Sequence, residues 1–555
     1  MVVPPWLLMN KKIFILLAFI VIIGSILRLW QLGKVPSSPD WDEVALGYNA
    51  YSIMQTGRDE YGKFLPIILR SFDDYKPALY VYLAMLPISI LGLDVVAVRL
   101  PSAAFGILTV LAVFFLVKEL FKRNDIALLT SLLLAISPMS IQFSRVAFEA
   151  NVGVALNVFG ILFFLKAFKK PWFLFLSTLM FGLSLHTYQS EKVFIPLLIA
   201  VIVYVFRKQF FSIKKKYILI SFLISTFICL PLIYFTLINE DALARAKGVS
   251  IFSNTSIIEA NADKIKRDRE NNDVLGLVLD NRRVELAKHV VGGYLSHFDL
   301  NWLFIKGDIA RHHAPGMGLL YLVELPFLLI GIYSLIFGKF DKRVKIFIIL
   351  WFLIVPIPAS VTNDVPHAVR AINFLPILQI LTAIGIISAL HKVSNFKFQI
   401  SNFQIRYLIS SLLFVLFIFN FAYYLNQYFV QQNYFHAKYW QYGYKNIVDY
   451  VATVQKDYKK IIVSNTATMD QSYMFFLFYL KYDPHKYLSE GGTLTGKIEG
   501  KNKFANFEFR KLNYYEENEK NILLIGSPFD FPEVFKTIHE INFPDKSLAI
   551  KVVEK

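Results

Sequence analysis

Long apolar runs alternate with short polar stretches along the chain, from about residue 13 to residue 428. Each run is about 17–23 residues long, and an α-helix of that length crosses the ~30 Å hydrocarbon layer of a membrane. We therefore expect an α-helical protein that crosses the membrane many times. The pattern predicts eleven membrane-spanning helices, at about residues 13–31, 98–117, 124–140, 149–166, 171–187, 192–207, 217–236, 317–337, 345–361, 369–390 and 407–428.

Basic residues are divided unequally between the two sides of these predicted helices. With the N-terminus inside, the inner loops hold twenty lysines and arginines, whereas the three short outer loops hold only Arg145, Lys192 and Arg370. This asymmetry follows the positive-inside rule. It predicts a plasma-membrane protein with a cytoplasmic N-terminus. Since no small-residue cleavage site follows the first apolar run, we expect that run to be a retained anchor.

One further apolar segment, residues 77–93, decides this topology. It is short and is interrupted by Pro87. If it crossed the membrane, every later loop would change sides and most of the inner basic residues would lie outside. We therefore expect a helix that lies in the outer interface or re-enters it.

The last part of the chain has a different pattern. Short strand-like runs at residues 460–463 and 522–526 alternate with helical patterns at residues 446–455 and 532–539. We expect two domains. The first is a membrane domain of residues 1–428, with outer loops at 32–97 and 237–316. The second is a small α/β domain of residues 429–555 outside the cytoplasm.

Composition supports this interpretation. The chain has 555 residues, of which 55% are hydrophobic and 16% aromatic, and its mean hydropathy is +0.48. Its net charge of +17 does not point to nucleic acid, because the basic residues lie in short loops and form no separate stripe. The single cysteine, Cys229, rules out an intrachain disulfide bond and a cysteine-based metal site.

The first outer loop carries the densest polar chemistry. Asp40, Asp42 and Glu43 lie within four residues of one another, just after the first predicted helix. A helix should begin here and end at Gly57. Asp40 and Glu43 have the spacing of a capping box, which would explain them without any function, but it does not explain Asp42.

Later parts of the same loop add groups that suit a phosphorylated lipid and a sugar. Arg58, Tyr75 and Lys76 belong to this set. Lys76 precedes the interfacial segment and would lie at the level of the lipid headgroups, where a phosphate would be. The alternative for Lys76 is an ordinary lysine that extends toward the membrane surface.

Other outer turns carry similar groups. They suggest a pocket at the outer membrane face, although scattered interfacial polar residues remain the alternative. Two adjacent histidines at the end of the second outer region are candidate metal ligands, but adjacent side chains point in different directions. The candidates in these turns are Arg145, Glu149, His186, Tyr188, His312, His313, His367 and Arg370.

The order of these motifs resembles a known family. An outer loop with the pair Asp42-Glu43 is followed by Asp74-Tyr75-Lys76-Pro77, then by Arg99-Leu100-Pro101-Ser102 and by Ser144-Arg145. The chain is similar in this respect to GT-C glycosyltransferases of the protein O-mannosyltransferase and lipid A aminoarabinose transferase branch. The resemblance covers about residues 13–200 and, in part, residues 290–380.

The resemblance implies an enzyme that moves a sugar from a polyprenyl-phosphate donor to a hydroxyl group of a protein, lipid or glycan, usually with inversion. It implies Asp42 as the general base and Glu43 as a group that orients the sugar or acceptor. Lys76 would contact the donor phosphate, and Arg145 and Arg58 would assist it.

The remaining candidates are assigned to substrate or metal. Asp40, Tyr75, Glu149, His186, Tyr188, His367 and Arg370 are candidate substrate-binding residues. A divalent metal is a candidate cofactor, with Glu149, His312 and His313 as candidate ligands. Tyr75 stands where the aminoarabinose transferases carry a glutamate, so a zinc site of their type is in question.

A transporter or flippase for a lipid-linked or small solute is the main alternative function. It would also explain charged groups near the membrane. However, transporter sites usually lie near the middle of the membrane and between repeated halves, whereas here the ionisable residues gather at the outer face and no repeat is visible.

Overall fold

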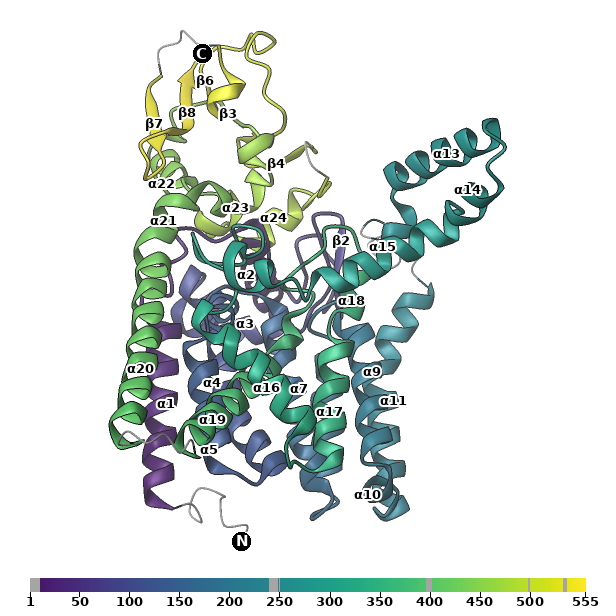
Figure 1. Cartoon of the computed structure of the whole chain (residues 1–555). Coiled ribbons are helices and arrows are strands. Elements are labelled where there is room, and N and C mark those ends of the chain that lie inside the picture. The colour runs from purple at the N-terminus through teal and green to yellow at the C-terminus, as the bar shows by residue number, and fades with distance from the viewer. Residues whose placement is uncertain (1–9, 239–247, 249, 396–401, 498–499, 533–536) are drawn as a thin grey trace. The chain divides into compact units, whose positions relative to one another are not determined.

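The computed structural model describes residues 10–238, 248, 250–395, 402–497, 500–532 and 537–555 (Figure 1). The chain forms two compact units, each built from separate stretches of sequence. Unit 1 comprises Met1–Ile23, Leu108–Ser140 and Gly153–Phe421, and unit 2 comprises Gly24–Ile107, Ile141–Val152 and Ala422–Lys555. The two compact units therefore do not divide at residue 428. The expected domain boundary at that residue stays a prediction.

Helices make up nearly all of unit 1, and some of them continue into unit 2. Apart from the helical arm described below, these helices are α1 (Lys11–Leu29), α4 (Val95–Phe121), α5 (Asn124–Ile136), α6 (Pro138–Ser144), α7 (Glu149–Ala167), α8 (Phe173–Ser184), α9 (Glu191–Val205), α10 (Arg207–Phe211), α11 (Lys215–Ile238), α16 (Leu325–Phe337), α17 (Lys342–Ile354), α18 (Ile357–Ser360), α19 (Ile377–Asn395) and α20 (Asn402–Asn426).

Among the described residues, seven helices are long and apolar enough to cross a membrane, or eight if the bent pair α5 and α6 counts as one span. The expected many-pass helical architecture is therefore confirmed, but the count of eleven is not. The difference lies in three predicted spans, where the structure has helices shorter than the ~30 Å hydrocarbon layer requires. They are α8 with 12 residues, α9 with 15 and α16 with 13.

Close helix packing in unit 1 depends on two glycines. A Cβ atom on Gly331 of α16 would lie 1.8 Å from the carbonyl oxygen of Leu381 on α19, and one on Gly385 would lie 1.8 Å from the carbonyl oxygen of Phe327. Any side chain at these positions would force the two helices apart. Small residues let helices approach closely inside a membrane, where water provides no hydrophobic driving force between them.

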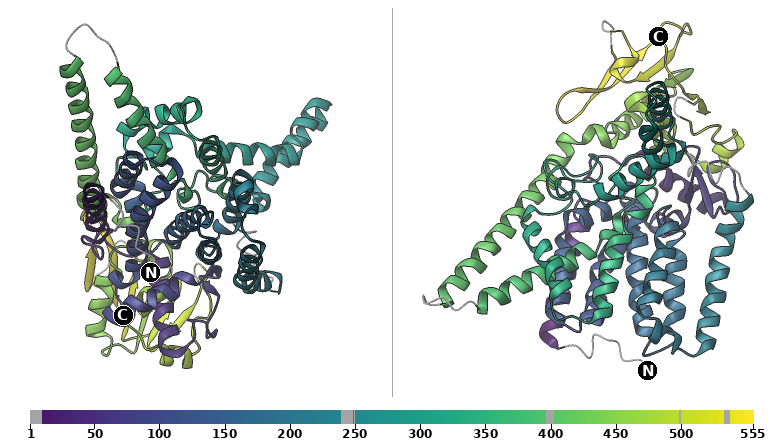
Figure 2. Two further views of the ribbon diagram at one scale, coloured as in Figure 1. Left: turned by 90° about the horizontal axis from the view of Figure 1, so that it is seen from below. Right: turned by 45° about the vertical axis from the view of Figure 1, so that its right-hand side comes forward.

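A helical arm projects from unit 1 to the side (Figures 1 and 2). It consists of α13 (Thr255–Glu270), α14 (Val274–Leu279) and α15 (Arg282–Ser296). These helices belong to the region 237–316, the second expected outer loop, of which residues 239–247 and 249 lie outside the described part.

The first part of unit 2 is the first outer loop. It contains α2 (Trp41–Thr56), the hairpin of β1 (Ile68–Ser71) and β2 (Asp74–Pro77), and α3 (Leu79–Leu91). Helix α2 begins at the N-cap Asp40 and ends at Gly57, as expected, and Gly57 has the left-handed φ of 72° that favours glycine at a helix end. Helix α3 has 13 residues, about 20 Å in length, so it is too short to cross the membrane alone.

The C-terminal part of unit 2 contains a six-stranded mixed sheet with the order β4-β5-β3-β6-β8-β7. The two predicted strands are confirmed as β3 (Lys460–Val463) and β6 (Ile522–Gly526), which pair in parallel at the centre. The predicted helix at residues 446–455 corresponds to α22 (Tyr444–Val454). Half of the helical pattern predicted at 532–539 falls outside the described residues, and its described half is not helical, since β7 begins at His539.

The remaining elements of this part complete the small α/β layer. They are α21 (Gln432–Phe435), α23 (Ser472–Tyr479), α24 (Pro484–Ser489), β4 (Asn502–Phe504), β5 (Phe507–Phe509), β7 (His539–Asn542) and β8 (Leu548–Glu554). Buried side chains from β3, β6 and β8, including Ile462, Leu524 and Val553, form one apolar core with Leu512 and Phe531.

Candidate functional site

The three carboxylates at the start of α2 lie in different environments. Asp40 accepts the backbone N–H of Glu43 at 2.9 Å, and Glu43 accepts that of Asp40 at 3.2 Å, so the capping box is present. The Asp40 and Glu43 residues are each 2% exposed, whereas the Asp42 side chain is 40% exposed. Of these three acids, Asp42 alone is open enough to meet a substrate.

Glu43 forms a buried ion pair with Arg99 of α4. Its two carboxylate oxygens accept Nε and Nη2 of Arg99 at 2.8 and 2.9 Å, and one of them also accepts the backbone N–H of Ala147 at 3.0 Å. The other guanidinium hydrogens bond to carbonyl oxygens of residues 32, 36 and 38. This arrangement fixes the start of α2 against α4 and the preceding loop.

Lys76 of β2 forms an ion pair with Asp42. The hairpin brings it there, because the turn residues Phe72 and Asp73 both have positive φ, 53° and 55°, as a tight two-residue hairpin requires. Leu69 then pairs with Lys76 across the two strands. The side chain of Lys76 is 13% exposed, so its ammonium group lies in a partly enclosed place beside the open carboxylate.

Arg145, after the end of α6, is fully buried. Its Nη atoms donate to the carbonyl oxygens of Leu27, Gln31 and Val35 at 2.9–3.2 Å, and its guanidinium group lies 4.8 Å from the centre of the Phe429 ring. Its assignment to the donor phosphate stays a prediction, and it would require some of these backbone contacts to be exchanged.

The other predicted residues of unit 2 have the following surroundings. Nη1 of Arg58 donates to the carbonyl oxygen of Gly62 at 2.7 Å. Tyr75 lies opposite Arg70 in the hairpin. Glu149 is buried at the first position of α7, so it does not share a helix with Arg145. Their substrate roles remain predictions.

A second buried carboxylate of the loop, Glu60, was not among the residues predicted to bind substrate. Its oxygens accept the amide of Asn49 at 3.0 Å and the hydroxyls of Tyr473 and Thr493 at 3.2 and 2.6 Å. Burial raises the pKa of Glu60 to about 7, although hydrogen bonds from Thr493 and Asn49 oppose the shift. Glu60 therefore ties the first outer loop to the C-terminal part of unit 2.

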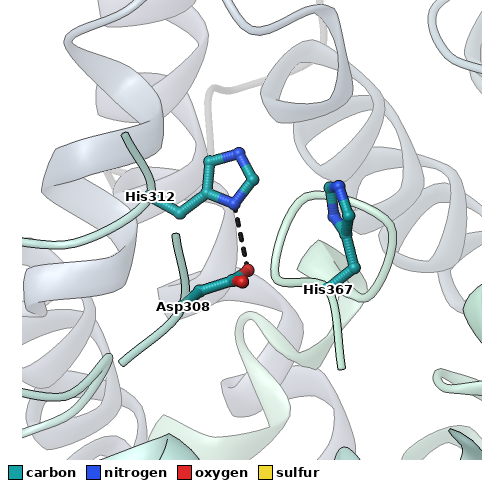
Figure 3. Close-up of side chains that lie close together, drawn as sticks. All are labelled: Asp308, His312 and His367. Carbon is teal, nitrogen blue, oxygen red and sulfur yellow. Dashed lines mark hydrogen bonds and ion pairs between the residues drawn. The ribbon is translucent and has the colours of Figure 1, made fainter. Parts of the chain in front are cut away.

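In unit 1, the structure brings His312 and His367 together with Asp308, which the sequence interpretation missed (Figure 3). Nδ1 of His312 lies 3.0 Å from a carboxylate oxygen of Asp308. One donor atom from each of these three residues lies within 4.8 Å of the others. The four-residue spacing of Asp308 and His312 could have indicated from the sequence that these two side chains lie close together. Nothing in the sequence indicated that His367 joins them.

The protonation states of this cluster follow from its surroundings. Burial alone would raise the pKa of Asp308, but the hydrogen bond and charge interaction with His312 outweigh it and hold that pKa below its usual range. Burial lowers the pKa of both His312 and His367. The surroundings thus favour the charged form of Asp308 and disfavour the charged forms of the two imidazoles.

The other predicted residues of unit 1 are not members of this cluster, although the backbone N–H of Arg370 donates to Nδ1 of His367 at 3.4 Å. A ring nitrogen of His313 lies 2.8 Å from the carbonyl oxygen of Ala314, and one of His186 lies 3.0 Å from that of Ile228. Nη1 of Arg370 donates to Thr362 and to the Asn363 carbonyl. Tyr188 is half-buried in the turn before α9.

A buried carboxylate of unit 1 also has defined partners. Glu191, at the start of α9, accepts the side-chain amides of Asn157 at 2.8 Å and Asn373 at 2.7 Å. The sequence did not reveal these partners, because they lie on other segments of the chain, 34 and 182 residues away.

Comparison with known proteins agrees with this architecture. Residues 75–235 match a sequence model of the family described as dolichyl-phosphate-mannose-protein mannosyltransferase. The match begins one residue before Lys76 and covers both Arg99 and Arg145. Comparison with curated proteins found no match for the chain.

Two solved structures show the fold. ArnT from Cupriavidus metallidurans bound to undecaprenyl phosphate is similar with a TM-score of 0.53 and 12% identity over 98% of each chain. The archaeal oligosaccharyltransferase AglB from Archaeoglobus fulgidus, in complex with an inhibitory peptide and a dolichol-phosphate, is similar with a TM-score of 0.51 and 13% identity. That alignment covers 84% of this chain and 63% of AglB, so the chain spans less than two thirds of the AglB length.

The many-pass helical architecture, the small C-terminal sheet and these likenesses define the class. The chain has the GT-C fold. Over residues 75–235 it is also similar to the family described as dolichyl-phosphate-mannose-protein mannosyltransferase.

The buried ion pair makes a first prediction. Arg99→Met should lower the free energy of unfolding by about 3–5 kcal/mol, because it leaves the Glu43 carboxylate buried without its cation. Thermal or denaturant unfolding in detergent measures this. Arg123→Met, which removes an exposed pair with Asp125, should cost less than about 1 kcal/mol. Equal losses in the two variants would contradict the account.

Glu60 makes a prediction about pH. Its folded-state pKa of about 7 lies above the unfolded value near 4.5, so between these values the folded state binds a proton that the unfolded state lacks. Stability should therefore fall, by up to about 3 kcal/mol, as pH rises through this range.

Glu60→Gln should remove that part of the pH dependence, and the exposed Glu516→Gln should not. Unfolding temperatures of the three proteins from about pH 5 to about pH 8 give the comparison. If Glu60→Gln kept the full wild-type slope, Glu60 would not be the titrating group.

Proposed function

We propose that the chain is a membrane glycosyltransferase that moves a sugar from a polyprenyl-phosphate donor to a hydroxyl acceptor outside the cytoplasm. The observation that carries this proposal is the ion pair of Asp42 and Lys76, which puts a half-exposed carboxylate and a partly enclosed cation side by side. The GT-C fold and the family match over residues 75–235 support it.

The reaction needs a base at one side of the sugar carbon and positive charge at the other. The acceptor hydroxyl oxygen attacks C1 of the sugar and forms the new C–O bond. The bond from C1 to the phosphate oxygen breaks, polyprenyl phosphate leaves, and the hydroxyl proton passes to Asp42. A single displacement of this kind inverts the configuration at C1. A positioned general base contributes typically ~10²–10⁴-fold to the rate.

Lys76 changes partners in this mechanism. Without donor, its ammonium group neutralises Asp42. When the donor binds, the ammonium group moves to the phosphate and the Asp42 carboxylate becomes available as a base. The same lysine then stabilises the negative charge that develops on the leaving phosphate. Binding of the donor and activation of the base are coupled through one side chain.

Glu43 has a positioning role in this proposal. Its oxygens accept hydrogen bonds from Arg99, Ala147 and Asp40, so it acts on the reaction by holding the first turn of α2 rather than by touching the sugar. Asp42, the preceding residue, keeps its direction because this turn is fixed.

The surroundings of the reaction follow the expectations from the sequence. The acceptor is a hydroxyl group on a protein, lipid or glycan. The protein lies in the plasma membrane with its N-terminus in the cytoplasm, and the C-terminal domain lies outside, where nucleotide sugars are absent and a lipid-linked donor is needed. No nucleic acid takes part.

Asp42→Asn tests the base. Purified protein is given a panel of polyprenyl-phosphate sugars, and released polyprenyl phosphate is measured together with donor binding. The variant should lose roughly 10²–10⁴-fold in turnover and bind donor as well as the wild type or more tightly, because Lys76 loses a competing anion. Asp94→Asn, a matched change at the exposed N-terminal side of α4, keeps a good capping residue and should leave turnover unchanged.

Two outcomes would contradict the proposal. One is full turnover in Asp42→Asn. The other is a wild-type protein that consumes no donor of a broad panel but moves a lipid or solute across vesicle membranes, which would support the transporter alternative.

Lys76→Met tests the phosphate contact. Loss of a charge-assisted hydrogen bond of about 1.5–3 kcal/mol should weaken binding of a polyprenyl-phosphate donor by roughly 10–100-fold. Lys63→Met, an exposed lysine of the same loop, should change the dissociation constant little. A similar loss in both variants would indicate general attraction of an anion rather than a contact at Lys76.

A further inference from the structure

The side-chain cluster of Asp308, His312 and His367 joins two segments of unit 1 that are far apart in the sequence. Asp308 and His312 lie between α15 and α16, and His367 lies between α18 and α19. Figure 3 shows the carboxylate and the two imidazole rings turned toward a common space. The rings of His312 and His367 have their centres 5.0 Å apart.

Hydrogen bonds that involve the backbone hold the segments that carry Asp308 and His367 in place. The carboxylate of Asp308 accepts the N–H of Ala368, the residue after His367, at 2.5 Å. The backbone N–H of His367 donates to Nε2 of His297 at 3.2 Å, and Nδ1 of His297 lies 2.7 Å from the Gly293 carbonyl oxygen. The cluster is thus built into the backbone of both segments and does not depend on flexible surface side chains.

In the loop that carries Asp308 and His312, the backbone of Gly307 packs closely against the ring of His313. Gly307 has a φ of 72°, and a Cβ atom there would lie 2.6 Å from the ring of His313. A residue with a side chain would strain the backbone and push His313 out of place. His313 therefore supports the loop from outside the cluster.

We propose that Asp308, His312 and His367 bind a divalent transition-metal ion, with Zn²⁺ as the best match. Two imidazoles and one carboxylate form a ligand set that Zn²⁺ uses in sites with an open position for water or another oxygen ligand. Zinc bonds of about 2.0–2.2 Å place neighbouring donor atoms about 3.3–3.5 Å apart. The donor atoms here lie within 4.8 Å of one another, so the widest separation needs to close by about 1.4 Å.

The donor types also restrict the choice of ion. Mg²⁺ and Ca²⁺ prefer oxygen ligands, whereas imidazole suits Zn²⁺, Fe²⁺, Co²⁺ and Ni²⁺. The bound ion would cross-link the loop at residues 307–313 to the segment at residues 362–370. This site is separate from the proposed catalytic pair of Asp42 and Lys76 in its residues, so the two proposals can fail independently.

Metal content of the full-length protein tests the site. Protein treated with a chelator is dialysed against Zn²⁺, and bound zinc is measured by mass spectrometry. Co²⁺ in place of Zn²⁺ gives a visible absorption spectrum that reports the coordination. We expect about one ion per chain, and a fall in affinity of at least ~100-fold in His312→Ala and in His367→Ala.

His289→Ala is the matched control, since this histidine lies on α15 with its side chain 44% exposed and is not a member of the cluster. It should keep zinc binding and the Co²⁺ spectrum. Asp308→Asn is the milder variant for the case in which an alanine variant does not fold, and it should still change the Co²⁺ spectrum. In chelator its unfolding temperature should match that of the wild type, and added Zn²⁺ should raise only the wild-type value.

Two results would overturn the proposal. One is wild-type protein that takes up neither ion. The other is uptake that survives in His312→Ala, His367→Ala and Asp308→Asn alike, which would place the metal elsewhere on the chain.

Discussion

The buried ion pair of Glu43 and Arg99 is the interaction on which the first outer loop depends. Arg99 uses its guanidinium hydrogens on Glu43 and on three carbonyl oxygens of the loop that precedes α2. Neither charge could be buried alone without a penalty of several kcal/mol. The pair therefore requires α2, α4 and the connecting loop to adopt one arrangement, and that arrangement leaves Asp42 facing outward.

With α2 fixed, a short hairpin completes the proposed reaction centre. It carries Lys76 to Asp42, and Glu60 links the following part of the loop to Tyr473 and Thr493. In the proposed mechanism, Lys76 has two partners in turn. It pairs with the base Asp42 in the donor-free protein and with the phosphate in the donor complex. This arrangement suits an enzyme whose donor remains anchored in the membrane.

Local patterns in the sequence were enough for several features. The spacing of Asp40 and Glu43 predicted the capping box, and two apolar runs predicted the central strands β3 and β6. Contacts between distant residues could not be predicted in this way. Arg99 lies 56 residues from Glu43, and Thr493 lies 433 residues from Glu60. The count of eleven spans was not confirmed, because apolar character alone does not fix where a helix begins and ends. Helices α8 and α9 end before their predicted limits, and α16 begins after its predicted start. The hairpin was missed because its turn residues, Phe72 and Asp73, lack the usual glycine signal.

The most direct test of the account is an experimental structure of the protein with a polyprenyl phosphate bound, compared with one without it. The account predicts that the ammonium group of Lys76 pairs with Asp42 in the lipid-free protein and lies within hydrogen-bonding distance of the phosphate in the complex, while Glu43 and Arg99 keep their contacts. A phosphate bound away from Lys76, with the Asp42–Lys76 pair intact, would contradict it.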